Sequence, residues 1–418
     1  AAGRRRERAR GRDGFDRGPS CRVRKSYHPS EWEIRWRENI DAWAQHSAHW
    51  RRPQDGVPLV LGAKGTTSCA AQRHDRHRFR PAVGACAKLR NESALVDRWV
   101  AAMAERGAAA DKAYATRTDR AGAPRRLAER PPGHAPRIFG YHRYETTNCT
   151  TAPDAAWEDD DGDVRHVAIE PLVGFLRHPL HVCFASDDDA TEKDGYKVDK
   201  SYLFTTARDE IFPPLTPPRR AFLFDLGAST YSTGFGGASQ SWFVDEYQKR
   251  GIEFDRIFAW EAAPLKHPAR LYAEYPHPYP LDTLSYFNAP ADPADDAKMN
   301  PLRFIKTHCR ADDFVVLKID IDHNTVENLF LRAILADVNL ADKIDELFWE
   351  NHVKRNPMYK CCWRDTPGID DDGDGTSFAT GASDSKSAGV VRGPNDITHS
   401  YEVFHALRER GIRAHSWV

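Results

Sequence analysis

The stretch that decides the fold is AFLFDLGASTYSTGFGG, residues 221–237. It opens with a dense apolar run and continues as a loop rich in Gly and Ser, with Gly227 at the junction. A short apolar run that stops at a glycine is typical of a buried strand followed by a turn. The next segment, residues 239–251, places Phe243 and Tyr247 four positions apart and closes on a glycine, as an amphipathic helix does. We therefore predict a strand, a loop and a helix in this order.

The same alternation continues to the end of the chain. Alternating helices and apolar strands favour βαβ units, in which parallel strands are joined by crossover helices. The pattern predicts an α/β fold: a mostly parallel sheet with helices on both faces, in three layers. Further strands are predicted at FDRIFAWE (254–261), DFVVLKIDID (313–322), IDELFWE (344–350) and 412–418, and further helices at 325–337 and 400–411.

Composition divides the chain of 418 residues into two regions. Residues 1–140 hold about 30 Lys and Arg against about 15 Asp and Glu, although the whole chain has a net charge of only -1. We predict a basic, partly disordered and partly helical N-terminal region at 1–165, and an α/β domain at 166–418. The core of that domain is predicted at 221–418, with an acidic loop insertion at about 356–395.

The N-terminal region carries few structural signals. Its Arg/Gly tract, residues 1–18, lacks an apolar period and is expected to be disordered. Trp32 and Trp36 follow helical spacing within 29–50, with Ser30 as a cap, and 94–113 is also expected to be helical. Aromatic residues are otherwise sparse and unpatterned, so we expect no specific nucleic-acid partner despite the basic charge.

Cysteine usage and hydropathy bear on the compartment. No pair of the eight cysteines has the two-residue gap of a zinc knuckle, so we expect no metal bound by cysteines. A reducing compartment, the cytoplasm, is the default expectation. No apolar run reaches the length of about 18 residues that a membrane-spanning helix needs. The sequence begins at Ala1 rather than Met, so a targeting segment can be missing from it.

Acidic residues stand at the ends of the predicted strands. Ligands of open parallel sheets bind outside the carboxyl ends of the strands, so this succession beside a Gly-rich loop is typical of a ligand site. A carboxylate just before the loop suits a cofactor with a cationic amino-acid end better than it suits a pyrophosphate. The loop also lacks the G-x-G-x-x-G spacing of dinucleotide sites. The strand-end acids are Asp225, Glu261, Asp320 with Asp322, and Glu350.

These segments resemble the FkbM family of S-adenosylmethionine-dependent methyltransferases. The resemblance rests on FLFDLGAS, RIFAWEAAP, VVLKIDID and the strand that ends in Trp-Glu-Asn-His, and it spans roughly 221–418. It implies a Rossmann-like methyltransferase fold and O-methylation of an unidentified acceptor.

The resemblance also implies roles for individual residues. Asp225, Gly227 and Ser229 would line the methionine end of S-adenosylmethionine, and Glu261 would hold its ribose. Asp320 would face the transferable methyl group. Separately, Asn288 lies between two predicted strands where an adenine edge is commonly bound, and we include it among the cofactor contacts.

Two departures from the family concern the loop and the acceptor side. The loop after Gly227 is longer than in the family, and the usual Asp-x-Glu-Gly is replaced by Asp-Ile-Asp-His at 320–323. Removal of a hydroxyl proton needs a base close to the acceptor. The candidates are His323, Asp322, His352 and Glu350.

Other interpretations remain open at the level of sequence. His323 can be a helix cap instead of a base. Asp320, Asp322 and Asn324 offer oxygen ligands for a divalent cation, but we predict no metal site. A binding or scaffold protein that keeps the fold without transferring methyl groups is one alternative function, and an NAD-dependent oxidoreductase is another. The sequence leaves the oligomeric state open.

Overall fold

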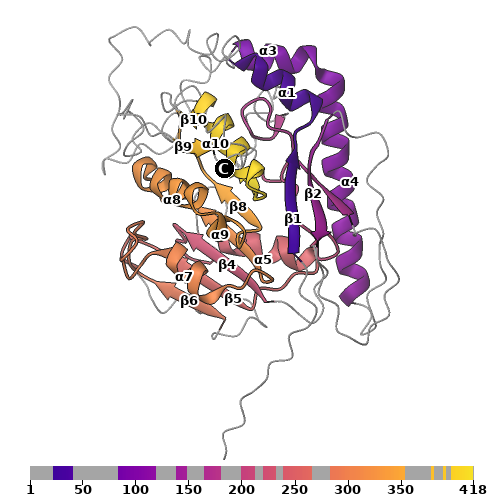
Figure 1. Ribbon diagram of the computed structural model, residues 1–418. Coiled ribbons are helices and arrows are strands. Elements are labelled where there is room, and N and C mark those ends of the chain that lie inside the picture. The colour runs from indigo at the N-terminus through magenta and orange to yellow at the C-terminus, as the bar shows by residue number, and fades with distance from the viewer. Residues whose placement is uncertain are drawn as a thin grey trace, which may run out of the picture.

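The computed structural model of the chain describes residues 22–40, 83–118, 138–147, 164–179, 199–211, 220–231, 239–265, 283–353, 378–380, 389–391 and 397–417 (Figure 1). The Arg/Gly tract at 1–18, the part of the Gly-rich loop at 232–238 and most of the predicted acidic insertion lie outside the described residues. Within the part that is described, no helix is both long and apolar enough to cross a membrane.

A six-stranded parallel sheet organises residues 220–417. Its order is β11-β8-β7-β4-β5-β6, and every neighbouring pair is parallel. β4 lies in the middle, so the chain moves outward through β5 and β6, then returns to the other side of β4 as β7, β8 and β11. The α/β class with a mostly parallel sheet is confirmed. The strands are β4 (Ala221–Leu226), β5 (Arg256–Trp260), β6 (Leu284–Phe287), β7 (Phe314–Ile319), β8 (Glu346–Trp349) and β11 (Arg413–Ser416).

Helices connect these strands. The predicted helix at 239–251 is α5 (Ser239–Lys249), and the one at 325–337 is α8 (Asn324–Ala336). α10 (Ile397–Glu409) begins three residues before its predicted start. Two short helices were not predicted, α7 (Pro301–His308) and α9 (Val338–Ala341). Both are held at their N-termini by side chains that accept backbone N–H groups, Asn300 for α7 and Asp337 for α9.

The first part of the predicted N-terminal helix is described. It is α1 (Glu31–Glu38), where Ser30 and Glu33 form a capping box. The indole N–H groups of Trp32 and Trp36 both donate to Oε2 of Glu92, at 2.8 and 2.9 Å. This carboxylate lies between α3 (Val83–Asn91) and α4 (Ser93–Thr118), and α4 contains the predicted helix at 94–113. Residues 41–50 of the predicted helix lie outside the described part.

An antiparallel sheet that the sequence pattern did not predict accompanies these helices. Its order is β1-β2-β3, formed by β1 (Arg22–His28), β2 (Gly140–Thr147) and β3 (Val164–Ile169). The predicted boundary at 165/166 falls inside β3. A two-stranded ribbon, β9 (Phe378–Thr380) with β10 (Gly389–Val391), lies within the predicted acidic insertion.

The N-terminal helices share the hydrophobic core of the parallel sheet, whereas the antiparallel sheet has a small separate cluster formed by Tyr144 and Val167 with Val23. Trp32, Trp36 and Trp99 belong to the same buried cluster as Phe224 and Trp349 of the parallel sheet. In Figure 1, α1, α3, α4, β1 and β2 lie together along one side of the molecule. The described part of the N-terminal region therefore packs against the α/β sheet.

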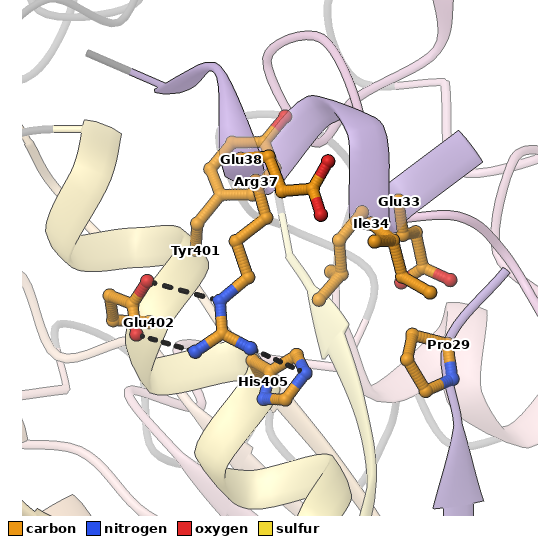
Figure 2. Close-up of a pocket in the computed structure, with 9 residues that line it drawn as sticks. Pro29, Glu33, Ile34, Arg37, Glu38, Tyr401, Glu402 and His405 are labelled. Carbon is orange, nitrogen blue, oxygen red and sulfur yellow. Dashed lines mark hydrogen bonds and ion pairs between the residues drawn. The ribbon is translucent and has the colours of Figure 1, made fainter. Parts of the chain in front are cut away.

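A polar contact reinforces this packing at the surface. Figure 2 shows Arg37 of α1 reaching Glu402 and His405 of α10 beside a cavity of about 450 Å³. The Arg37 guanidinium makes hydrogen bonds of 3.2 and 3.0 Å to the Glu402 carboxylate and one of 2.8 Å to Nε2 of His405. None of the residues that line this cavity is a predicted site residue.

Candidate cofactor and catalytic site

The carboxyl ends of four adjacent strands bring the predicted acidic residues to one edge of the sheet. Asp225 is the penultimate residue of β4, Glu261 follows β5, Asp320 follows β7 and Glu350 follows β8. Register places these ends side by side: Asp225 is paired with Ala259, and the N–H of Glu350 donates to the carbonyl of Ile319 at 3.1 Å. β4 and β7 are the neighbours between which the chain changes direction, where open α/β sheets bind ligands.

Gly227 forms the turn that leaves β4. Its N–H donates to the carbonyl of Trp260 at 2.9 Å, and its φ of +79° lies in the left-handed region. A Cβ atom at this position would lie 1.6 Å from the carbonyl oxygen of Asp320. Only glycine fits here, because the turn after β4 presses directly on the backbone that follows β7.

Lys318 is a member of the site that the sequence reasoning missed. Its Nζ lies 3.3 Å from Oδ1 of Asp225 and 3.0 Å from Oδ2 of Asp320, and donates to the carbonyl of Gly227 at 2.9 Å. Burial alone would lower the pKa of Lys318, but the two carboxylates outweigh it and raise this pKa. The available signal was a lysine inside an otherwise apolar strand, because lysines are almost never fully buried unless they are paired.

This pairing changes what Asp225 can do. The Asp225 side chain is fully buried against Lys318, whereas Asp320 keeps 20 % of its side chain exposed. Burial would raise the pKa of Asp320, but Lys318 holds it below its usual value. Asp320 therefore presents a carboxylate at the rim of the site. Asp225 lies one layer deeper, where it contacts the lysine instead of the surface.

Glu261 and Asn288 hold the loops beside β5. The carboxylate oxygens of Glu261 accept the N–H groups of Ser229 at 2.8 Å and Ala263 at 2.7 Å. The Asn288 amide donates to the carbonyls of Glu261 and Ala263, and its oxygen accepts the N–H of Leu265. Ser229 has a positive φ of 50°, and its carbonyl accepts the hydroxyl of Tyr286 at 2.6 Å. Glu261 thus ties the turn after β4 to the end of β5, while Asn288 shapes the turn after β5.

Three of the four predicted base candidates meet beyond β7 and β8. Nε2 of His352 lies 3.3 Å from Oδ1 of Asp322 and 3.7 Å from Oε2 of Glu350. The His352 side chain is 1 % exposed and that of Glu350 13 %, whereas Asp322 is 81 % exposed. Burial raises the pKa of Glu350 to about 8, with a further contribution from Asp320. Burial would lower the pKa of His352, but Glu350 and Asp322 together raise it to about 9.

The fourth candidate, His323, has a different position. It is the residue before α8, and its side chain makes no capping hydrogen bond. It therefore does not act as the helix cap that the sequence allowed. No contact brings its ring to His352 or Glu350 among the interactions of the described residues.

Two members of the oxygen-ligand trio considered from the sequence make other polar contacts. Asp320 pairs with Lys318, and the Asn324 amide nitrogen donates to the carbonyl of His352 at 2.5 Å. A different group meets the spacing of metal ligands within the described part of the chain. One ligand atom from each of Asp322, Glu350 and His352 lies within 4.8 Å of the others.

Two cations from the segments before β4 border this group. The Nζ of Lys200 lies 4.6 Å from the ring centre of Trp417, at the end of β11. Burial lowers the pKa of Lys200 to about 8, and Glu350 opposes this shift. Burial also lowers the pKa of Arg177, and Glu350 again opposes the shift. The sequence reasoning missed both residues because they precede the core motifs by many positions.

Comparisons with protein-family models, with curated proteins and with solved structures gave no match for this chain.

Proposed function

We propose that the chain is an S-adenosylmethionine-dependent methyltransferase that acts on a hydroxyl group of its acceptor. The observation that carries the proposal is the acidic edge at the switch point of the sheet. Glu261 stands at the end of β5 beside the Gly227 turn, and no glycine phosphate loop follows β4 in the sequence. This edge favours a cofactor with a ribose and a cationic end over a pyrophosphate.

Glu261 has the capacity to hold a ribose. Each of its two oxygens accepts one backbone N–H, and a carboxylate oxygen has two lone pairs, so both oxygens keep acceptor capacity. The neighbouring N–H groups also fix the side chain, which lowers the entropy cost of binding. Asp225 fits the cofactor-binding role that the family resemblance implies less directly, because its carboxylate is paired with Lys318. We assign Asp225 to positioning Lys318 and the Gly227 turn, and Asp320 to the cationic end of the cofactor.

In the proposed reaction, the cofactor supplies the methyl group, and the protein removes the proton and orients the acceptor. S-adenosylmethionine, when bound, supplies a methyl group whose bond to a cationic sulfur breaks to leave a neutral thioether. The acceptor oxygen forms the new bond to that carbon, and its proton leaves to the chain. Glu350 and His352, close together past β8, are the groups that would take this proton when they are deprotonated, and that fraction grows as the pH rises through their pKa values of about 8 and 9. Orientation of the acceptor opposite the sulfur is the other requirement.

An NAD-dependent oxidoreductase is the alternative function that the strand order of the sheet also allows. The observed strand order is also the order of classic dinucleotide-binding folds, and an acid after the second strand can hold the ribose of NAD. The distinction rests on the sequence of the turn after β4, which lacks the phosphate-binding spacing. The test therefore needs NAD as a competing ligand.

Calorimetric titration of the full chain with S-adenosylmethionine tests the proposal. We expect micromolar affinity, and a loss of at least tenfold in Glu261→Ala. The matched control is Glu253→Ala, which removes an exposed glutamate just before β5, at the opposite end of that strand. The control should bind as the unaltered chain does.

Two results would overturn the proposal. One is the absence of S-adenosylmethionine binding by folded protein, and the other is tight binding of NAD that Glu261→Ala abolishes. If S-adenosylmethionine binds but no hydroxyl acceptor in a panel is methylated, the scaffold alternative gains over the enzyme.

A further inference from the structure

We propose that Asp322, Glu350 and His352 bind one divalent transition-metal ion at the carboxyl ends of β7 and β8. The three side chains offer two carboxylate oxygens and one imidazole nitrogen within 4.8 Å of one another. Aspartate, glutamate and neutral histidine are all common ligands of such ions. This site differs from the oxygen-only trio considered from the sequence.

The spacing of the ligand atoms fits a coordination shell. Metal–ligand bonds of about 2.0–2.2 Å place neighbouring ligand atoms roughly 3.0–3.5 Å apart around a tetrahedral or octahedral centre. Nε2 of His352 lies 3.3 Å from Oδ1 of Asp322 and 3.7 Å from Oε2 of Glu350. The Asp322 and Glu350 oxygens lie within 4.8 Å of each other, so the two carboxylates would have to move together to bind a common ion.

The backbone holds the ligands from two adjacent strands. β7 and β8 are paired in parallel, and the N–H of Glu350 continues that ladder to the carbonyl of Ile319. The amide of Asn324 fixes the loop after β8 through the carbonyl of His352. Two of the ligands are thus positioned before any ion binds, which reduces the entropy lost on binding.

A second observation points to a bound group at the same place. Buried polar atoms of two residues beside the ligands in the chain have no hydrogen-bond partner among the described residues: Oδ1 of Asn324 and Oδ1 of Asn351. Asn324 and Asn351 are 2 % and 4 % exposed, and buried polar atoms without partners are rare in folded proteins. Asn351 stands between Glu350 and His352 in the chain, and the Asn324 amide donates to the carbonyl of His352, so water on a bound ion is the donor that we propose for the two amide oxygens.

The imidazole ligand sets the class of ion. Mg²⁺ and Ca²⁺ prefer sites made only of oxygen atoms, whereas imidazole suits Zn²⁺ and other transition-metal ions, and the two carboxylates also suit Mn²⁺. Three protein ligands leave at least one position open, as in catalytic metal sites. Resting on the proposed function, we assign that position to the acceptor hydroxyl. With the ion bound, Glu350 and His352 serve as its ligands, and the proton that the ion makes easier to remove would leave to solvent.

The experiment measures metal binding on the full chain, without cofactor or acceptor. Metal-free protein is titrated with Mn²⁺ and followed by electron paramagnetic resonance, and Zn²⁺, Mg²⁺ and Ca²⁺ are then added as competitors. Asp322→Asn tests a ligand whose side chain is exposed and whose φ of 55° asparagine tolerates. Glu350→Gln tests the second ligand. Asp312→Asn is the matched control, an exposed aspartate at the opposite end of β7.

We expect one Mn²⁺ per chain, displaced by Zn²⁺ more readily than by Mg²⁺ or Ca²⁺. Asp322→Asn and Glu350→Gln should each weaken binding at least tenfold, while Asp312→Asn leaves it unchanged. Absence of binding up to millimolar Mn²⁺, or equal affinity in Asp322→Asn and Asp312→Asn, would overturn the proposal. Titration with S-adenosylmethionine in the presence of a chelator reports on the proposed function separately, so failure of one proposal does not carry over to the other.

Discussion

At the scale of single residues, Gly227 has the least freedom to change. Its left-handed φ and the 1.6 Å approach of a Cβ to the Asp320 carbonyl are independent obstacles to any side chain. We expect Gly227→Ala to lower the free energy of unfolding by at least about 2 kcal/mol, because both backbones must shift. Urea denaturation of the full chain measures this.

The control for that substitution is Gly107→Ala. Gly107 is exposed within α4, and a Cβ there would meet no atom within 4 Å. Alanine should stabilise this helix by up to about 1 kcal/mol. Equal stability of the two variants would contradict the tight packing at Gly227.

Lys318 gives a second prediction at this scale. Replacement by methionine keeps the length of the side chain but leaves Asp225 buried without a cation. Breaking a buried pair by removing one partner costs about 3–5 kcal/mol. We expect Lys318→Met to lose this amount in urea denaturation and Lys298→Met, an exposed lysine before α7, to lose almost nothing. A Lys318→Met protein as stable as the unaltered chain would show that the ion pair contributes little.

At the scale of elements, α10 should be sensitive to acid. His399 on this helix is 3 % exposed, and burial, with a contribution from Arg332, lowers its pKa to about 4. An unfolded histidine has a pKa of about 6.5. Between these values the unfolded chain binds a proton that the folded chain does not, so stability falls as the pH falls.

The loss from this one group should reach about 2 kcal/mol between pH 7 and pH 5. His399→Gln cannot take up the proton, so its free energy of unfolding should depend less on pH by that amount. His308→Gln, which changes an exposed histidine on α7, should follow the unaltered chain. Identical pH curves for His399→Gln and the unaltered chain would mean that other buried groups cause the acid sensitivity.

At the scale of the whole molecule, buried ion pairs join the N-terminal elements to the α/β sheet. Arg408 of α10 is fully buried, and its guanidinium contacts Glu33 of α1 at 3.4 Å and Glu170, the residue after β3, at 3.1 Å. The hydroxyl of Tyr27 on β1 lies 3.2 Å from the same group. Removal of the N-terminal elements would leave a buried cation short of partners.

We therefore expect residues 166–418 to be unstable alone. The full chain should unfold in one cooperative thermal transition, whereas the fragment should melt at a lower temperature and bind a hydrophobic dye, because the shared core is opened. A chain that begins at residue 22 is the control and should melt like the full chain. A fragment that melts at the same temperature as the full chain would mean that the N-terminal elements add nothing to stability.

The strands β4, β5, β7 and β8 could be predicted from the sequence alone. Strands buried on both faces of a parallel sheet are continuous apolar runs, so local composition was enough to find them. The strand-end acids could be located for the same reason, because each follows its own apolar run. By contrast, β1 and β2 carry mixed polar patterns, and their sheet forms through pairings between distant segments.

The sequence by itself determined the α/β class, the positions of β4, β5, β7, β8 and β11 and of α5, α8 and α10 along the chain, and the acidic ends of the strands. Only the tertiary structure decided that Asp225 is buried against Lys318, and that Asp322, Glu350 and His352 meet at one edge of the sheet. The physical reason is the distance in sequence between the residues that interact. A strand or helix follows from the spacing of neighbouring residues, whereas the partner of a charged side chain depends on the register of strands that lie far apart in the sequence.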